Sequence, residues 1–235
     1  MPGILDGQLA LVTGASRGIG AAIAEALARE GAHVVLTART GAALEEVEER
    51  IHEAGGSATI APLDLTDGDS IARLGAAISG RWEALDLLVL NAAMLGSLAP
   101  VHAVESKEFN RVMTLNLLAQ QAMVATFDAM LRKSERSRVL AVTSSVGRHP
   151  RAYWGAYGAS KAALETLLLS YAEENRHFPS PKVAIVDPGA TATKMRASAF
   201  PGEDPTTVKP AGAVAEAVME MLRSGFETGY RLEVR

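Results

Sequence analysis

Short apolar runs alternate along the whole chain with longer segments in which apolar residues recur at helical spacing. Several runs, such as "LALVT" and "VVLTA", are nearly continuous in apolar residues, which is typical of strands covered on both faces. Alternating strands and helices predict a single α/β domain with a doubly wound, seven-stranded parallel sheet and helices on both faces. The expected strands are Gln8–Thr13, His33–Ala38, Ser57–Leu63, Asp86–Asn91, Arg138–Ser144, Lys182–Asp187 and Tyr230–Val234.

The segments between these strands predict about six helices, and no linker, repeat or low-complexity stretch divides the chain. In sheets of this kind, ligands bind beyond the carboxyl ends of the strands, so the residues that follow each strand are the candidates for a site. The helices are expected around Ile19–Leu27, Leu44–Ile51 and Ile71–Ile78, and over Lys107–Arg132, Tyr157–Arg176 and Ala213–Leu222.

Composition excludes several classes of function. The net charge of −4 over 235 residues argues against nucleic acid as a partner. The absence of cysteine excludes disulfides, thiol nucleophiles and thiolate metal sites, and the five scattered histidines predict no metal site. The N-terminus lacks the pattern of a signal peptide, and no apolar run approaches the roughly 18 residues that span a membrane. We therefore expect a soluble, cytoplasmic protein.

The first expected strand runs directly into a glycine-rich turn, "TGASRGIG", and then into a helix. Gly14 permits a tight turn, and Gly18 and Gly20 would let the backbone approach a phosphate. The helix start near Ile19 offers free N–H groups and a positive dipole end to a pyrophosphate. A purely structural turn is the alternative, but the strand before it and the helix after it favour a dinucleotide site.

The charge near the second strand decides which dinucleotide is expected. Sites for NAD usually place an acid about 20 residues beyond the glycine turn to bind the ribose hydroxyl. Here the second strand ends without an acid and with Arg39, while Arg17 lies in the glycine turn itself. Because arginine matches phosphate geometry, the pair would suit a 2′-phosphate, although Arg39 could instead be a solvated loop residue. The sequence predicts NADP(H) over NAD(H).

Tyr157 and Lys161 are separated by four residues and therefore lie on the same helix face. An ammonium beside a phenol favours the phenolate and lowers the tyrosine pKa, as a general acid or base requires. Such pairs are also common on surfaces. A catalytic role for this pair is favoured by the presence of Ser144 at the end of the fifth strand. Ser144 is preferred to its neighbour Ser145 as the catalytic serine. Tyr153 has no such lysine and precedes the expected helix.

The motifs "TGASRGIG", the serine before "SVG", and "YGASK" together resemble the short-chain dehydrogenase/reductase family, over the whole chain. The resemblance implies a Rossmann fold and hydride transfer between a nicotinamide and an alcohol or carbonyl. It also implies a catalytic tetrad of Asn116, Ser144, Tyr157 and Lys161, in which the asparagine supports a water that feeds the lysine. From the residues alone, a buried asparagine bonded to backbone would explain Asn116 equally well.

The resemblance also assigns cofactor contacts. Asp64 is similar to an acid that hydrogen-bonds the adenine, and "PGATAT" to a loop that holds the nicotinamide through Thr193. At Leu90–Ala93 the chain reads "LNAA" where the family commonly has Asn-Asn-Ala-Gly, so a side-chain bond that stabilises the central sheet is in doubt. The expected cofactor-binding residues are Gly14, Ser16, Arg17, Gly18, Ile19, Gly20, Arg39, Asp64, Leu65, Asn91, Ala92, Tyr157, Lys161, Pro188, Gly189, Thr191 and Thr193.

Within that family, "SSVGR…WGAYGASK" and "RASAFPGEDP" are similar to bacterial YciK-type oxidoreductases. The segment 194–210 has prolines and no clean period, so we expect a substrate lid there, with a disordered connector as the alternative. The resemblance further implies a homodimer or homotetramer packed through the two long helices.

The sequence thus predicts an NADP(H)-dependent oxidoreductase acting on a small carbonyl or secondary alcohol. A regulator that senses NADP(H) without catalysis is the rival from another class, and only "LNAA" favours it. Sugar-nucleotide epimerisation or dehydration is a second rival, disfavoured by the glycine spacing and by the short segment after the last strand.

Overall fold

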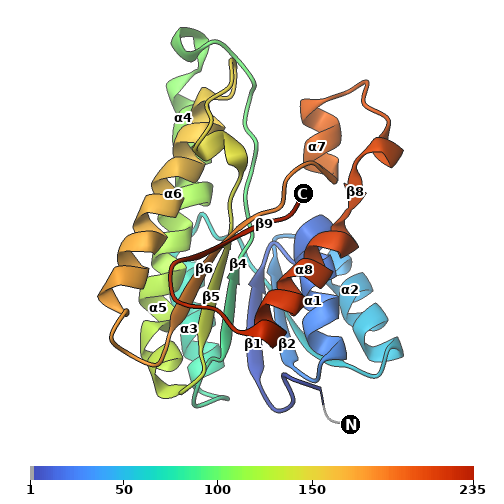
Figure 1. The fold of residues 1–235 in the computed structure, drawn as a ribbon, viewed down its shortest axis with the longest axis vertical. Helices are drawn as coiled ribbons and strands as arrows, with labels where there is room; N and C mark the ends of the chain where they lie inside the picture. The colour runs from blue at the N-terminus through green and yellow to red at the C-terminus, as the bar shows by residue number, and fades with distance from the viewer. Residues whose placement is uncertain (1–2) are drawn as a thin grey trace.

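Seven strands form one parallel sheet in the order β3-β2-β1-β4-β5-β6-β9 (Figure 1). The structure is a computed structural model that describes residues 3–235. The doubly wound parallel sheet expected from the sequence is confirmed. Its strands are β1 (Leu9–Thr13), β2 (His33–Ala38), β3 (Ser57–Pro62), β4 (Leu87–Leu90), β5 (Arg138–Val142), β6 (Lys182–Asp187) and β9 (Tyr230–Glu233).

Two layers of helices cover the sheet, and each has its own apolar core (Figure 1). Successive side chains of a strand point to opposite faces, so Val34 and Leu36 of β2 pack into one core while Val35 packs into the other. Full burial of a side chain of this size contributes about 1.5–3 kcal/mol. One layer holds α1 (Gly18–Arg29), α2 (Gly41–Glu53) and α8 (Ala211–Ser224); the other holds α3 (Gly68–Ser79), α5 (Ala119–Lys133) and α6 (Gly155–Glu174).

Hydrogen bonds between β1 and β4 close the centre of the sheet, where the strand order reverses. The Thr13 hydroxyl accepts from the backbone N–H of Asn91 at 2.9 Å and of Ala92 at 3.1 Å. The Asn91 amide in turn donates to the carbonyls of Thr13 at 2.9 Å and Gly14 at 3.1 Å. Leu90 is fully buried in the core. Asn91 and Thr13 therefore tie the two strands together despite the altered "LNAA".

The long helix expected over Lys107–Arg132 is interrupted in the middle. It consists of α4 (Ser106–Met113), a π-helical turn over Thr114–Leu118, and α5. Turns of this kind are frequent at functional sites. The interruption places Asn116 at its centre.

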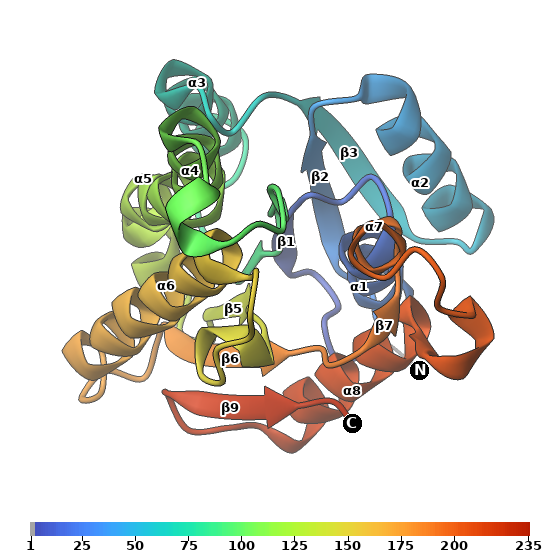
Figure 2. The same ribbon diagram turned by 90° about the horizontal axis from the view of Figure 1, so that it is seen from above.

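The segment expected to be a lid contains more regular structure than its sequence indicates. It holds the helix α7 (Lys194–Ala199), and the short strands β7 (Thr191–Ala192) and β8 (Lys209–Pro210) pair at its base. Figures 1 and 2 show this segment standing beyond the carboxyl ends of the strands, apart from the two helical layers. It therefore lies over the edge of the sheet where ligands of this fold class bind.

Candidate active site

A cleft of about 1440 Å³ opens at the carboxyl ends of the strands, and every predicted motif contributes to its lining. Of the expected site residues, Gly20 and Asn116 do not line the cleft. The others do: Gly14, Ser16, Arg17, Gly18, Ile19, Arg39, Asp64, Leu65, Asn91, Ala92, Ser144, Tyr157, Lys161, Pro188, Gly189, Thr191 and Thr193.

The glycine turn fits so closely against the end of β4 that side chains are excluded from it. Gly14 has a φ of +64°, and a Cβ there would lie 2.9 Å from the Cα of Ala92. A Cβ on Gly20 would lie 2.4 Å from the amide nitrogen of Asn91. Gly20 thus serves the site from behind, because it allows the start of α1 to pack against the Asn91 loop.

The two arginines expected to bind phosphate are exposed at the cleft. Arg17 is the N-cap residue of α1, and no side chain caps that helix end. Asp64 accepts hydrogen bonds from the backbone N–H and hydroxyl of Thr66, at 2.9 and 2.8 Å. These bonds, with a smaller contribution from the charge of Arg39, lower the pKa of Asp64. This end of the cleft combines an uncapped helix N-terminus, two cations and a fixed carboxylate.

Tyr157 lies at the other end of the cleft, in the first turn of α6, with only 7% of its surface exposed. Burial raises the pKa of its phenol above the ordinary value, and the charge of Asp187 raises that pKa further. The neighbouring Ser144 hydroxyl acts in the opposite direction and lowers the pKa of Tyr157. The net direction differs from the lowering expected from Lys161 alone.

Lys161 is buried one helical turn beyond Tyr157. Its Nζ donates to the carbonyl of Val142 at the end of β5, at 2.8 Å, and lies 5.8 Å from the centroid of the Tyr157 ring. Burial lowers the pKa of Lys161 to about 8. The cleft therefore holds a phenol, a serine hydroxyl and an amine that titrates near neutral pH.

Asn116 is fully buried behind the cleft and bonded mainly to backbone. Its Oδ1 accepts from the N–H of Met94, and its Nδ2 donates to the Met94 carbonyl, both at 2.8 Å. The same Nδ2 donates to the Ser160 hydroxyl at 3.0 Å, which donates to the Tyr157 carbonyl at 2.7 Å. The backbone-bonded alternative is thus what the structure contains, and these bonds join the π-helical turn to the helix of Tyr157.

Neighbouring residues of the same type differ in their position relative to the cleft. Ser144 lines the cleft, whereas Ser145 begins a short 3-10 turn and is not part of the lining. Tyr153 is 59% exposed, precedes α6 and also lies outside the lining.

The segment 194–210 contacts the cleft through aromatic side chains. The Trp154 ring lies 5.9 Å from the Tyr157 ring and 5.8 Å from the Phe200 ring of this segment, centroid to centroid. The Arg196 guanidinium stacks over Phe200 at 3.7 Å and forms two hydrogen bonds of 2.6 Å with the Glu203 carboxylate. Trp154 is therefore a wall of the cleft that is continuous with the segment 194–210.

Ser160 is buried behind the cleft and could have been found from the sequence, since it lies three residues after Tyr157, inside the "YGASK" motif. Other residues line the cleft without a local signal in the sequence, and only the fold brings them there: Met94, Leu95, Lys107, Asn110, Arg111 and Thr114 on one side, and Met195, Arg196, Ser198 and Ala199 from the segment 194–210.

No helix within residues 3–235 has the length and apolar character needed to cross a bilayer. Over the same residues, no three histidine or acidic side chains are grouped so that they could hold a metal ion.

The sequence matches the family described as short chain dehydrogenase over residues 8–204, which is most of the chain. The chain belongs to this family. This short-chain dehydrogenase is 36% identical over 209 residues to the uncharacterized oxidoreductase YciK of Escherichia coli K12, with 88% of this chain and 82% of that protein covered. Family membership identifies the chain as an oxidoreductase, as the sequence predicts.

Solved structures of other short-chain dehydrogenases share the fold over the whole chain. One from Shigella flexneri 2a, in complex with NADP, is 33% identical, has a TM-score of 0.92, and is matched over 100% of this chain and 99% of that one. Another from E. coli CFT073, in complex with NADPH, is 32% identical, has a TM-score of 0.93, and is matched over the same shares. The expected cofactor class is thus the one bound by these relatives.

Proposed function

We propose that this short-chain dehydrogenase transfers hydride between NADP(H) and a carbonyl or secondary alcohol. The main support for the proposal is that the glycine turn and the candidate catalytic side chains line the same cleft. A glycine turn suited to phosphates lies at one end of it, and the Tyr157 phenol, the Ser144 hydroxyl and the Lys161 amine lie at the other. A dinucleotide that spans the cleft would bring its nicotinamide to the phenol.

The residues at the phosphate end fit NADP(H). Gly14 leaves backbone, without a side chain, at the cleft, and Gly20 lets the start of α1 pack closely behind it. The uncapped N-terminus of α1 would bind a pyrophosphate, and Arg17 and Arg39 a 2′-phosphate. The NADP and NADPH complexes of the two relatives support the assignment.

The nicotinamide, when bound, supplies or accepts the hydride. In the reductive direction Ser144 would hold the carbonyl oxygen, and Tyr157 would donate its phenolic proton to that oxygen. The raised pKa of Tyr157 keeps the phenol protonated at neutral pH, as a proton donor must be. The Lys161 amine would bind the nicotinamide ribose and, as an ammonium, lower the pKa of the phenol once the site is assembled.

Asn116 has a supporting part in the proposal. Its bonds to Met94 and Ser160 hold the π-helical turn against the first turn of α6. We assign to it the support of a proton relay to Lys161 that the family resemblance implies. The segment 194–210 is assigned the role of substrate lid, because Phe200 contacts the cleft wall at Trp154.

Arg39→Ala should weaken NADPH binding at least about tenfold and leave NADH binding within about twofold. An arginine–phosphate contact is a charge-assisted hydrogen bond that contributes about 1.5–3 kcal/mol, and NADH lacks the phosphate. Fluorescence titration with both cofactors measures the ratio. Arg29→Ala is the matched control, because Arg29 is exposed on α1 and pairs with Glu216. Equal losses for the two cofactors would contradict the assignment of the phosphate site.

We propose a homodimer or homotetramer in the cytoplasm, packed through the long helices α4–α5 and α6. Leu118 supports this, because it is 58% exposed in the middle of the first of these helices.

A further inference from the structure

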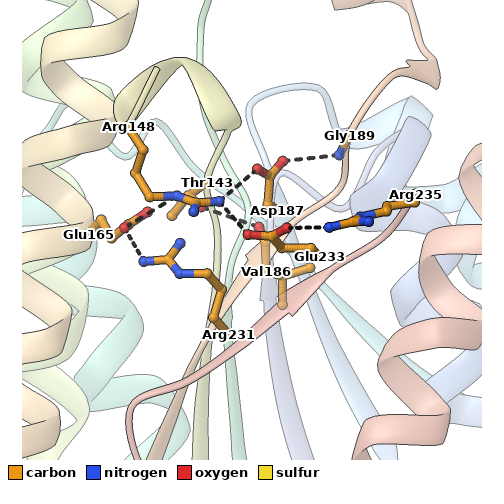
Figure 3. Close-up of polar contacts among 9 residues, drawn as sticks. All are labelled: Thr143, Arg148, Glu165, Val186, Asp187, Gly189, Arg231, Glu233 and Arg235. Atoms are coloured by element: carbon orange, nitrogen blue, oxygen red, sulfur yellow. Dashed lines mark hydrogen bonds and ion pairs between the residues drawn. The ribbon is translucent and has the colours of Figure 1, made fainter. Parts of the chain in front are cut away.

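Arg148 follows the catalytic serine by four residues, and its guanidinium lies among carboxylates from three other elements (Figure 3). Its Nη2 lies 2.8 Å from Glu233 Oε1 on β9 and 3.4 Å from Asp187 Oδ2 at the end of β6. Its Nε lies 3.9 Å from Glu165 Oε1 on α6. One side chain thus joins the turn after β5 to two strand ends and to the helix of Tyr157.

The turn between Ser144 and Arg148 is short and internally bonded. The N–H of Gly147 donates to the Ser144 carbonyl, and the N–H of Arg148 donates to the Ser145 carbonyl, both at 3.0 Å. A rigid turn transmits the position of one end to the other. Anchoring Arg148 therefore also fixes the backbone of Ser144.

Among the carboxylates around Arg148, Asp187 has the most direct connection to the candidate active site. Its side chain is only 8% exposed, and its Oδ1 accepts from the N–H of Gly189, in the loop that lines the cleft, at 3.1 Å. Its charge raises the pKa of the Tyr157 phenol. Lys209 faces Asp187 as well, and the charge of Asp187 acts on it, while its Nζ donates to the Ala190 carbonyl at 3.1 Å.

The carboxylates around Arg148 differ in their other partners (Figure 3). Glu165 also pairs with Arg231, and Glu233 also pairs with Arg235 at 3.7 Å. Within residues 3–235, the cation at ion-pair distance from Asp187 is Arg148 alone. Loss of Arg148 would thus leave Asp187 the least compensated carboxylate of the group.

We propose that Arg148 is a positioning residue for the reaction. It holds the turn that carries Ser144 against the ends of β6 and β9, and it balances the Asp187 charge near the Tyr157 phenol. This inference rests on the proposed function for the role of Tyr157, and it adds a residue that the tetrad does not contain.

The test compares Arg148→Met, Asp187→Asn and the double variant by the pH dependence of kcat/KM for NADP⁺-dependent alcohol oxidation. This rate rises with pH as the phenol that accepts the proton ionises, and Lys161, whose Nζ lies 5.8 Å from the centroid of that ring, is the same in every variant. Arg148→Met should move the rising limb to higher pH by about 0.5 unit or more, since it leaves a carboxylate unbalanced. Asp187→Asn should move it to lower pH. When Arg148→Met is added to Asp187→Asn, it should move the rising limb by less than about a third of the distance that it moves it in the wild type.

Arg231→Met is the matched control. It removes one cation from the same group, but Arg231 pairs with Glu165 and not with Asp187. The rising limb of its pH profile should coincide with that of the wild type. If Arg148→Met does not fold, Arg148→Lys should keep the wild-type limb because it keeps the charge, and Asp187→Asn must still shift downward. Shifts of the same sign in Arg148→Met and Asp187→Asn, or an unmoved limb in both, would overturn the proposal.

A second measurement separates this proposal from the proposed function. Tyrosine labelled with ¹³C at Cζ reports ionisation by NMR in the presence of NADP⁺, and Tyr157→Phe identifies the signal. The same opposite shifts are expected in the titration of that signal, with no turnover required. Failure to oxidise any alcohol, together with these shifts, would reject the proposed reaction and retain the role of Arg148. Coincident titrations in all variants would reject that role.

Discussion

Tyr157→Phe should lower kcat about a thousandfold while NADPH binds with a dissociation constant within about twofold of the wild type. The substitution removes only the phenolic O–H, and a positioned general acid typically contributes 10²–10⁴-fold. The ring stays buried beside Trp154, so the fold and the cleft should be preserved. Initial rates of NADPH oxidation and fluorescence titration measure the two quantities.

Tyr153→Phe provides the matched control for that experiment. It makes the same chemical change four residues earlier, on a side chain that is 59% exposed and outside the cleft lining. Its turnover should equal that of the wild type. Near-normal turnover of Tyr157→Phe would show that the phenol is not the proton donor.

Lys161→Met should stabilise the protein at pH 7 by about 2 kcal/mol in the absence of cofactor, although it should abolish turnover. Burial lowers the pKa of Lys161 from 10.5 to about 8. Below pH 8 the amine is protonated in both the folded and unfolded states, and the folded state carries the full cost of the buried charge. That cost is roughly 3 kcal/mol. Lys161→Met removes it, but the variant also loses the hydrogen bond to Val142, which contributes about 1 kcal/mol.

The direction in which stability changes with pH distinguishes the effect of a buried charge from a simple packing effect. Between about pH 8 and 10.5 the unfolded state binds more protons than the folded state, so the stability of the wild type rises with pH. The advantage of Lys161→Met should therefore fall over this range and be gone above pH 10.5. Urea unfolding at pH 7 and pH 10.5 measures it, with the exposed Lys133→Met as control. A destabilised Lys161→Met at pH 7 would be incompatible with the low pKa.

The parts of the fold that the sequence predicts are those with a local signal. The glycine turn follows from the spacing of Gly14, Gly18 and Gly20, and the pairing of Tyr157 with Lys161 follows from helical geometry. The parallel, doubly wound arrangement of the sheet follows from the alternation of strands and helices. The ends of elements were less accurate: β4 ends at Leu90 rather than Asn91, because the Asn91 N–H bonds to the Thr13 hydroxyl instead of to the ladder.

Features set by distant parts of the chain could not be predicted. The π-helical turn at Asn116 accompanies bonds to Met94 and Ser160, which are remote in sequence. The direction of the Tyr157 pKa depends on burial and on Asp187, thirty residues away, whereas local reasoning could weigh only Lys161.

Arg148 is the clearest case of a residue without a local signal. In the sequence it is one basic residue in a loop, and its partners lie on β6, β9 and α6. Only the sheet order, which places β6 between β5 and β9, brings these charges together.

Hydride transfer itself is the central claim, and isotope transfer from the cofactor tests it most directly. The protein would be incubated with NADPH carrying deuterium at both positions of C4 of the nicotinamide and with a panel of ketones and aldehydes, and the products analysed by mass spectrometry. We predict that a product alcohol carries one deuterium on the former carbonyl carbon, and that Tyr157→Phe forms it about a thousandfold more slowly. Tight NADPH binding with no deuterated product from any member of the panel would contradict the account, and would favour a protein that senses NADP(H) without catalysis.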